Sequence, residues 1–203
     1  EGPDGSPQEH NEELLQELAQ SLIYQQAEQY DGDGVSKSLG VSGSSSSSNL
    51  TDVLAAYTNA NAEGQYNLDD TGSITGIPNN GFGSGYTNVK LAQPSYLQVF
   101  FGQYYITANL FVQADYNNGS GSLTYTEQFN PTGSLVGQGF VFNNNLAGSG
   151  SLCAGPCTIN VSGLFYPPAA LTAGINYTIP SNLIGGGITG QAGFYTNTVP
   201  APG

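Results

Sequence analysis

The chain has 203 residues and a formal net charge of -13, and only 8% of its residues are charged. Thirteen of its fifteen acidic residues precede residue 71, and beyond it the charged side chains are Lys90, Asp115 and Glu127. A chain so poor in cations cannot neutralise nucleic-acid phosphates, which excludes nucleic acid as a partner and disfavours anionic membrane surfaces. No run of about 20 apolar residues occurs, so no membrane span is expected.

The same scarcity of charge argues against an enzyme. The chain has no Arg, and its one His, His10, lies in a Gly/Pro-rich start, so neither a Ser–His–Asp nor a Cys–His arrangement is available. The glycine runs at 81–85 and 185–187 lack the Lys that accompanies a phosphate-binding loop. We therefore expect no catalytic residues, no metal and no cofactor.

Residues 1–70 are predicted to form an acidic N-terminal extension. Asn11 is suited to cap a helix over about residues 11–29, because two acids follow it and apolar residues then recur at helical spacing. The stripe consists of Leu14, Leu15, Leu18 and Leu22. This amphipathic helix packs either on its own domain or on a neighbouring subunit.

A second apolar segment follows and alternates like a strand, with Val35, Leu39 and Val41 on one face. The Asp-Gly-Asp-Gly sequence at 31–34 resembles the start of a calcium loop, but the later EF-hand ligands are missing. A flexible Ser-rich linker is expected at 42–48.

A short helix is predicted after the linker, through Val53, Leu54 and Tyr57. Either residues 35–41 or residues 50–57 could complete the sheet of another copy by strand addition.

Residues 71–203 are predicted to form one charge-poor, all-β domain, an antiparallel β-sandwich or barrel. The clearest strand runs from Tyr104 to Tyr116 and pairs with a return strand from Leu123 to Phe129, which makes a hairpin. Further strands are expected over residues 135–142, 158–165, 175–179 and 188–195.

Cys153 and Cys157 are the only cysteines and are separated by three residues at the tip between two predicted strands. A metal site is the alternative, but no His or second Cys pair completes four ligands. We predict that they form a disulfide, as expected in a secreted protein.

Secretion is expected on three grounds. The chain starts at Glu1 without Met, which indicates a processed mature protein. Its low share of charged residues suits an extracellular surface. Cytosolic domains, by contrast, typically have about 25% charged residues. Four Asn-x-Ser/Thr sequons are candidate sites for N-linked glycans: Asn49, Asn118, Asn160 and Asn176.

Asp115 and Glu127 are the only carboxylates of the β block and lie on adjacent predicted strands. A pair of carboxylates could hydrolyse glycosides, and a solitary Lys beside an acid could form a Lys–Asn isopeptide crosslink. We favour the simpler interpretation, an ion pair of these acids with Lys90.

The composition is similar to that of extracellular filament proteins from microbes in harsh environments, though no family motif is present. We expect a secreted, non-enzymatic structural protein at the cell surface. It would be a subunit of an extracellular filament, pilus or surface matrix that assembles with other copies of itself through its N-terminal extension. The alternative is an extracellular carbohydrate- or small-ligand-binding β-barrel or sandwich.

Overall fold

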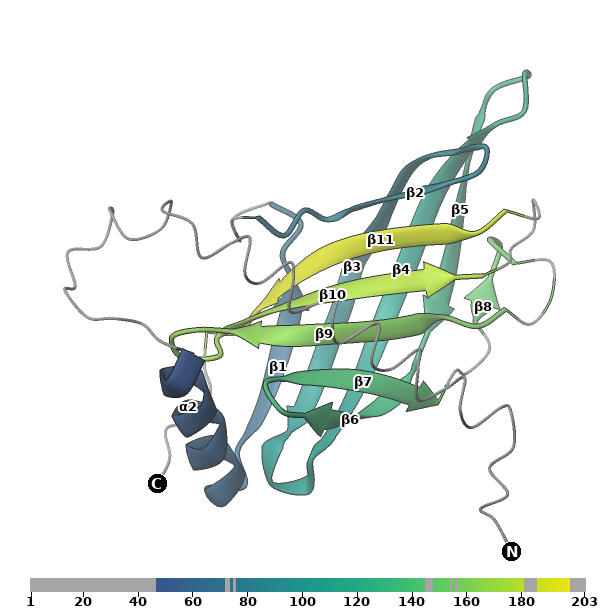
Figure 1. Ribbon diagram of the computed structural model, residues 1–203. Coiled ribbons are helices and arrows are strands. Elements are labelled where there is room, and N and C mark those ends of the chain that lie inside the picture. Colours follow the sequence, from purple (N-terminus) through teal and green to yellow (C-terminus); the bar gives the residue numbers. More distant parts are fainter. Residues whose placement is uncertain are drawn as a thin grey trace, which may run out of the picture. The chain divides into compact units, whose positions relative to one another are not determined.

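The computed structural model describes residues 47–71, 74, 76–144, 148–153, 155, 157–180 and 186–197. These residues belong to one compact unit, which begins at Ser45. Within them the chain forms one α-helix, one 3₁₀ turn and eleven strands (Figure 1). The elements are α2 (Ser47–Asn59), β1 (Glu63–Leu68), β2 (Asn80–Gly83), β3 (Tyr86–Phe100), η1 (Phe101–Gln103), β4 (Tyr105–Asn117), β5 (Ser122–Phe129), β6 (Thr132–Val136), β7 (Gly139–Asn144), β8 (Ser149–Gly150), β9 (Asn160–Tyr166), β10 (Thr172–Ile179) and β11 (Ile188–Tyr195).

The sheet closes on itself as an eight-stranded antiparallel barrel. Its ring runs β3–β2–β11–β10–β9–β7–β6–β4 and closes through the β3–β4 pairing. At two positions of the ring, two strands share the same neighbours. β1 and β2 both pair with β3 and β11, and β5 and β6 both pair with β4, at different points along these strands. The expected antiparallel all-β fold is therefore confirmed, in its barrel form.

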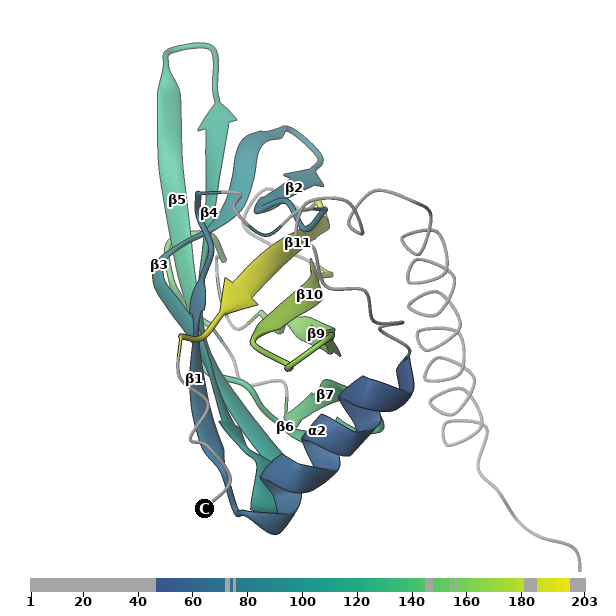
Figure 2. The same ribbon diagram turned by 90° about the vertical axis from the view of Figure 1, so that its left-hand side faces the viewer.

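The long β4–β5 hairpin projects beyond the neighbouring strands (Figures 1 and 2). Its turn is held by side chains of the loop itself, since Asn117 and Asn118 accept the amide N–H groups of Gly119 and Ser120 at 2.9 Å each. Gly119 has φ +83°, a left-handed conformation that suits glycine. The predicted hairpin is therefore confirmed, and it places Asp115 and Glu127 on adjacent strands.

α2 closes the end of the barrel where β3 turns into β4. Its buried side chains are Leu50, Leu54 and Tyr57. Burial of each contributes about 1.5–3 kcal/mol. The Tyr57 ring lies 5.1 Å from that of Phe101 in η1, and its hydroxyl donates to the Ala169 carbonyl at 2.9 Å. The helix thus joins the β3–β4 turn to the β9–β10 turn.

The core beside α2 is aromatic and converges on Phe165 of β9. The rings of Tyr66, Phe101 and Phe140 lie 5.6, 5.6 and 5.2 Å from it, and all four side chains are buried. Rings of this size fit because glycines face them: a Cβ on Gly163 would collide with the Phe140 ring. Glycines on neighbouring strands therefore leave room for large aromatic side chains in a close-packed core.

The start of the folded unit differs from the expected boundary after residue 70. α2 packs into the core, and β1 pairs with both β3 and β11, so residues 47–68 belong to the barrel unit. The short helix predicted through Tyr57 is confirmed, although it begins at Ser47. Residues 50–57 are therefore not an assembly strand, because they are helical. The predicted helix at 11–29 and most of the linker at 42–48 lie outside the described residues.

The predicted strand over 135–142 is in fact two strands. β6 ends at Val136 and β7 begins at Gly139, because Gly137 has φ +58° and reverses the chain. None of the described helices has the length and apolar character needed to cross a membrane.

Candidate functional site

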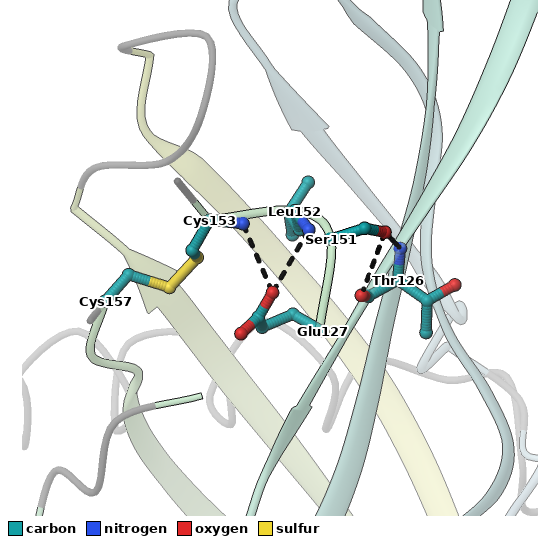
Figure 3. The surroundings of a disulfide bond; sticks show 6 residues. All are labelled: Thr126, Glu127, Ser151, Leu152, Cys153 and Cys157. Carbon is teal, nitrogen blue, oxygen red and sulfur yellow. Dashed lines mark hydrogen bonds between the residues drawn. A yellow bond between two sulfur atoms is a disulfide. The ribbon is translucent and has the colours of Figure 1, made fainter. Parts of the chain in front are cut away.

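The best-defined polar site is the disulfide loop around Glu127. Glu127 lies on β5 opposite Val112 of β4, so its side chain faces the barrel interior and is 1% exposed. Its Oε2 accepts the main-chain N–H groups of Leu152 and Cys153 at 3.1 and 3.2 Å (Figure 3). A buried carboxylate must be hydrogen-bonded to be tolerated, and here the main chain supplies the donors.

Two glycines let the loop approach this carboxylate. A Cβ on Gly148 would lie 2.7 Å from Oε1 of Glu127, and one on Gly150 would lie 3.0 Å from Oε2. Gly150 also pairs with Glu127 across the β5–β8 ladder. Larger residues at these positions would push the loop off the carboxylate, so the glycines are a requirement of this site.

Cys153 and Cys157 form the predicted disulfide, with their Cα atoms 6.0 Å apart. Leu152, which directly precedes Cys153, is fully buried in the core. Gly148 donates its N–H to the Cys157 carbonyl at 3.0 Å, which joins the two ends of the segment. One ligand atom from each of Glu127, Cys153 and Cys157 lies within 4.8 Å of the other two. These three residues could bind a metal only if the disulfide were reduced.

A second polar cluster surrounds Asp115 on the outer face of the hairpin. The Thr124 hydroxyl donates to Oδ1 of Asp115 at 2.6 Å, and the Asn88 amide donates to Oδ2 at 2.8 Å. These two hydrogen bonds, with a smaller contribution from the positive charge of Lys90, hold the pKa of the Asp115 carboxyl below its usual value.

The structure does not bring Lys90, Asp115 and Glu127 together as one ion-paired group. Lys90 is exposed and opposite Gln113 on β4, and Asp115 is bonded to Thr124 and Asn88. Glu127 faces the interior instead. Asp115 and Glu127 therefore lie on opposite faces of the sheet and cannot flank one glycosidic bond. Lys90 is exposed whereas Glu127 is buried, so the two are not placed for the isopeptide crosslink, which was the less favoured alternative.

β5 also exposes a main-chain edge. Thr126 directs its main-chain groups away from β4, because its N–H bonds to Ser151 Oγ at 3.1 Å and its carbonyl accepts the Ser151 N–H at 2.8 Å. Main-chain groups alternate in direction along a strand, so those of Ser122 and Thr124 point to the same edge. β8 pairs with β5 only at Glu127 and Gln128. Among the described strands, none pairs with that edge at residues 122–124.

The sequons occupy different environments. Asn118 is exposed at the hairpin tip, and Asn160 is exposed at the start of β9. Asn176 is partly buried on β10, and its side-chain oxygen accepts the Gln191 amide at 2.8 Å. Asn49 lies in α2. The predicted assembly residues Leu14, Leu15, Leu18, Leu22, Val35, Leu39 and Val41 lie outside the described residues.

The binding of Glu127 to the main chain of the disulfide loop was not predicted from the sequence. A signal for its orientation was present, because Leu123, Tyr125, Glu127 and Phe129 alternate along β5 and therefore share a face. An acid in an apolar row predicts a buried carboxylate. Its partners, the amides of Leu152 and Cys153, could not be predicted because any main-chain N–H can serve.

Neither the family models nor the curated proteins that were compared with this chain show a match to it.

Proposed function

We propose that this protein is a secreted, non-enzymatic structural subunit that assembles with copies of itself into an extracellular filament or surface matrix. The observation that carries the proposal is the β5 edge at Ser122 and Thr124, on a hairpin that projects from the barrel (Figure 2). Exposed strand edges are templates for pairing with another chain. The occupant that we propose is the Val35–Val41 segment of a second copy.

The side chains around this edge favour such a partner. Leu123 is 48% exposed, and it shares a face of β5 with Tyr125. An added strand with Val35, Leu39 and Val41 on one face would cover this apolar surface. Its main chain would form hydrogen bonds with the outward main-chain groups of Ser122 and Thr124. The added strand would thus gain both main-chain hydrogen bonds and apolar burial, as in other cases of strand addition.

The outer surface of the barrel suits an extracellular protein. Pairs of side-chain amides take the place of charges across adjacent strands, as in the 2.8 Å hydrogen bonds from Gln128 to Asn109 and from Gln191 to Asn176. The Cys153–Cys157 disulfide is compatible with an oxidising compartment. Glycans on Asn118 and Asn160, the two exposed sequons on strands or turns, are part of the proposal.

Substitutions at Thr124 test the assembly edge. Thr124→Pro removes the outward N–H that an added strand would need, and edge strands tolerate Pro where no ladder bond is lost. Thr124→Val is the matched control, because it also removes the hydroxyl that bonds Asp115 but keeps the N–H. We expect polymers by electron microscopy and fast sedimentation for the wild type and Thr124→Val, but not for Thr124→Pro.

A donor substitution completes the test. Leu39→Asp in the full chain should abolish polymers as Thr124→Pro does, while circular dichroism shows an intact barrel. If folded Thr124→Pro assembles like the wild type, the β5 edge is not the acceptor.

A carbohydrate-binding function remains the second candidate, but on the outer face rather than in a pocket. The interior rings of Tyr66 and Phe165 pack on each other. On the outside, Phe100 and Tyr105 form a cross-strand aromatic pair with ring centroids 5.9 Å apart, beside the paired Gln98 and Thr107. Retardation of the wild type, but not of Tyr105→Ala, in gels containing a neutral polysaccharide would support this function.

A further inference from the structure

We propose that, once its disulfide is reduced, this chain binds a zinc-class divalent cation through the thiolates of Cys153 and Cys157 and the carboxylate of Glu127. The disulfide loop is therefore a site with two alternative closures, one covalent and one through a metal. The proposal is independent of the assembly edge.

The positions of the three side chains carry the proposal. Their ligand atoms lie within 4.8 Å of one another. In a tetrahedral zinc site, metal–ligand bonds of about 2.0–2.3 Å place neighbouring ligand atoms roughly 3.5–3.8 Å apart. The carboxylate must therefore approach by about 1 Å, and the released sulfurs must separate. Cα atoms 6.0 Å apart leave the two cysteines close enough for both thiolates to reach one ion.

The surroundings of Glu127 resemble those of a supported metal ligand. Outer hydrogen bonds to a ligating carboxylate fix its orientation, and Oε2 already accepts the N–H groups of Leu152 and Cys153. Figure 3 shows the carboxylate below these two amides and beside the disulfide. Two thiolates and one carboxylate suit Zn²⁺ rather than Mg²⁺ or Ca²⁺, which prefer oxygen ligands only, and a water molecule would complete the tetrahedron.

The reduction step needs an external dithiol or phosphine. With a dithiol, the S–S bond of the protein breaks, each cysteine sulfur gains one electron and one proton, and the dithiol leaves as a disulfide. Binding of the cation then releases the two thiol protons to solvent. The bound ion would hold Cys153 beside Cys157 as the disulfide did, which keeps Leu152 in the core.

The test uses the full chain in oxidised and phosphine-reduced forms, titrated with Co²⁺ without oxygen. We expect the reduced form to bind one Co²⁺ per chain, with a near-ultraviolet thiolate-to-metal band and the visible bands of tetrahedral Co²⁺. Zn²⁺ should displace the Co²⁺ and raise the unfolding temperature of the reduced form alone. Cys153→Ser should lose the thiolate spectrum in large part.

Glu127→Gln tests the third ligand, and Asp115→Asn is its control because Asp115 lies on the outer face. We expect Glu127→Gln to weaken Co²⁺ binding at least about tenfold and Asp115→Asn to leave it unchanged. Equal binding by Glu127→Gln and wild type would overturn the proposed site. So would a reduced wild type without a thiolate band, a result that decides the matter even if Glu127→Gln does not fold.

Discussion

Buried oxygen atoms in this barrel are mostly matched by main-chain groups rather than by charged side chains. Asp69 is 2% exposed and accepts the N–H groups of Thr71 and Ile74 at 3.1 and 2.6 Å, much as Glu127 accepts those of its loop. Tyr66 donates its hydroxyl to the Ala170 carbonyl at 2.6 Å. With two lysines and no arginine in the chain, the backbone is the main available source of partners.

The Tyr177 hydroxyl is an exception, since it is buried without a hydrogen-bond partner among the described groups. Removing an unpaired buried hydroxyl relieves its desolvation cost, so Tyr177→Phe should raise the free energy of unfolding by about 1 kcal/mol. Tyr66→Phe is the matched control and should lower it by about 1 kcal/mol, because a hydrogen bond is lost. Urea unfolding of both variants measures the difference. A destabilised Tyr177→Phe would mean that the hydroxyl has a partner.

Asp115 should make a small, pH-dependent contribution to stability. Its folded-state pKa is lowered, so the contribution is present above the unfolded pKa and is lost as the pH falls through the lower folded pKa. We expect an NMR titration to give a pKa for Asp115 below the ordinary Asp value of about 3.9. Thr124→Val should raise it, because the hydrogen bond that contributes most is removed. An unchanged pKa in Thr124→Val would show that Thr124 is not the cause.

At the scale of elements, α2 and β1 are parts of the barrel rather than of a tail. β1 occupies the strand position between β3 and β11, and α2 covers Phe101 at the end of the barrel. The helix was predicted but was assigned to the extension, and β1 holds few apolar residues in alternation, which is why the predicted domain began too late. Only Tyr66, Leu68 and Gly64 form the inward row of β1.

Truncation distinguishes the two boundaries. A chain that starts at Ser45 should fold cooperatively, whereas a chain that starts at Thr71 should not. The longer deletion exposes Phe101 and leaves β3 and β11 without a partner strand at one end. Near-ultraviolet circular dichroism and thermal unfolding provide the measurement. A cooperative transition in the chain starting at Thr71 would show that α2 and β1 are dispensable.

At the scale of the molecule, the folded unit has few charges to screen. From Ser45 to Gly203 the sequence holds six acidic residues and one lysine, a formal net charge of -5. Barrel stability must therefore come from apolar burial and neutral hydrogen bonds, which depend weakly on ionic strength.

We accordingly expect the urea midpoint of the chain starting at Ser45 to change little between low salt and about 1 M NaCl. Assembly of the full chain should respond more strongly, because residues 1–44 add nine acids and one lysine. In the absence of salt these segments repel one another, so polymerisation should accelerate with NaCl. Light scattering measures the rate of polymerisation, and urea unfolding measures the midpoint. A large shift of the midpoint would reveal a charge network that the barrel depends on.

The sequence by itself determined the antiparallel β class, the β4–β5 hairpin and the disulfide. Each depends on residues close together in the chain: alternation along Tyr105–Asn117, the Asn/Gly turn, and two cysteines separated by three residues. Local geometry limits such features to few solutions.

Only the tertiary structure decided that the sheet closes, that residues 47–68 complete it, and that Glu127 meets the amides of Leu152 and Cys153. Closure depends on the β3–β4 and β7–β9 pairings acting together, and β1 is recruited by strands up to about 130 residues away. Such contacts are selected by the total apolar area buried and the hydrogen bonds completed. Both quantities are properties of the assembled barrel, and no single segment contains them.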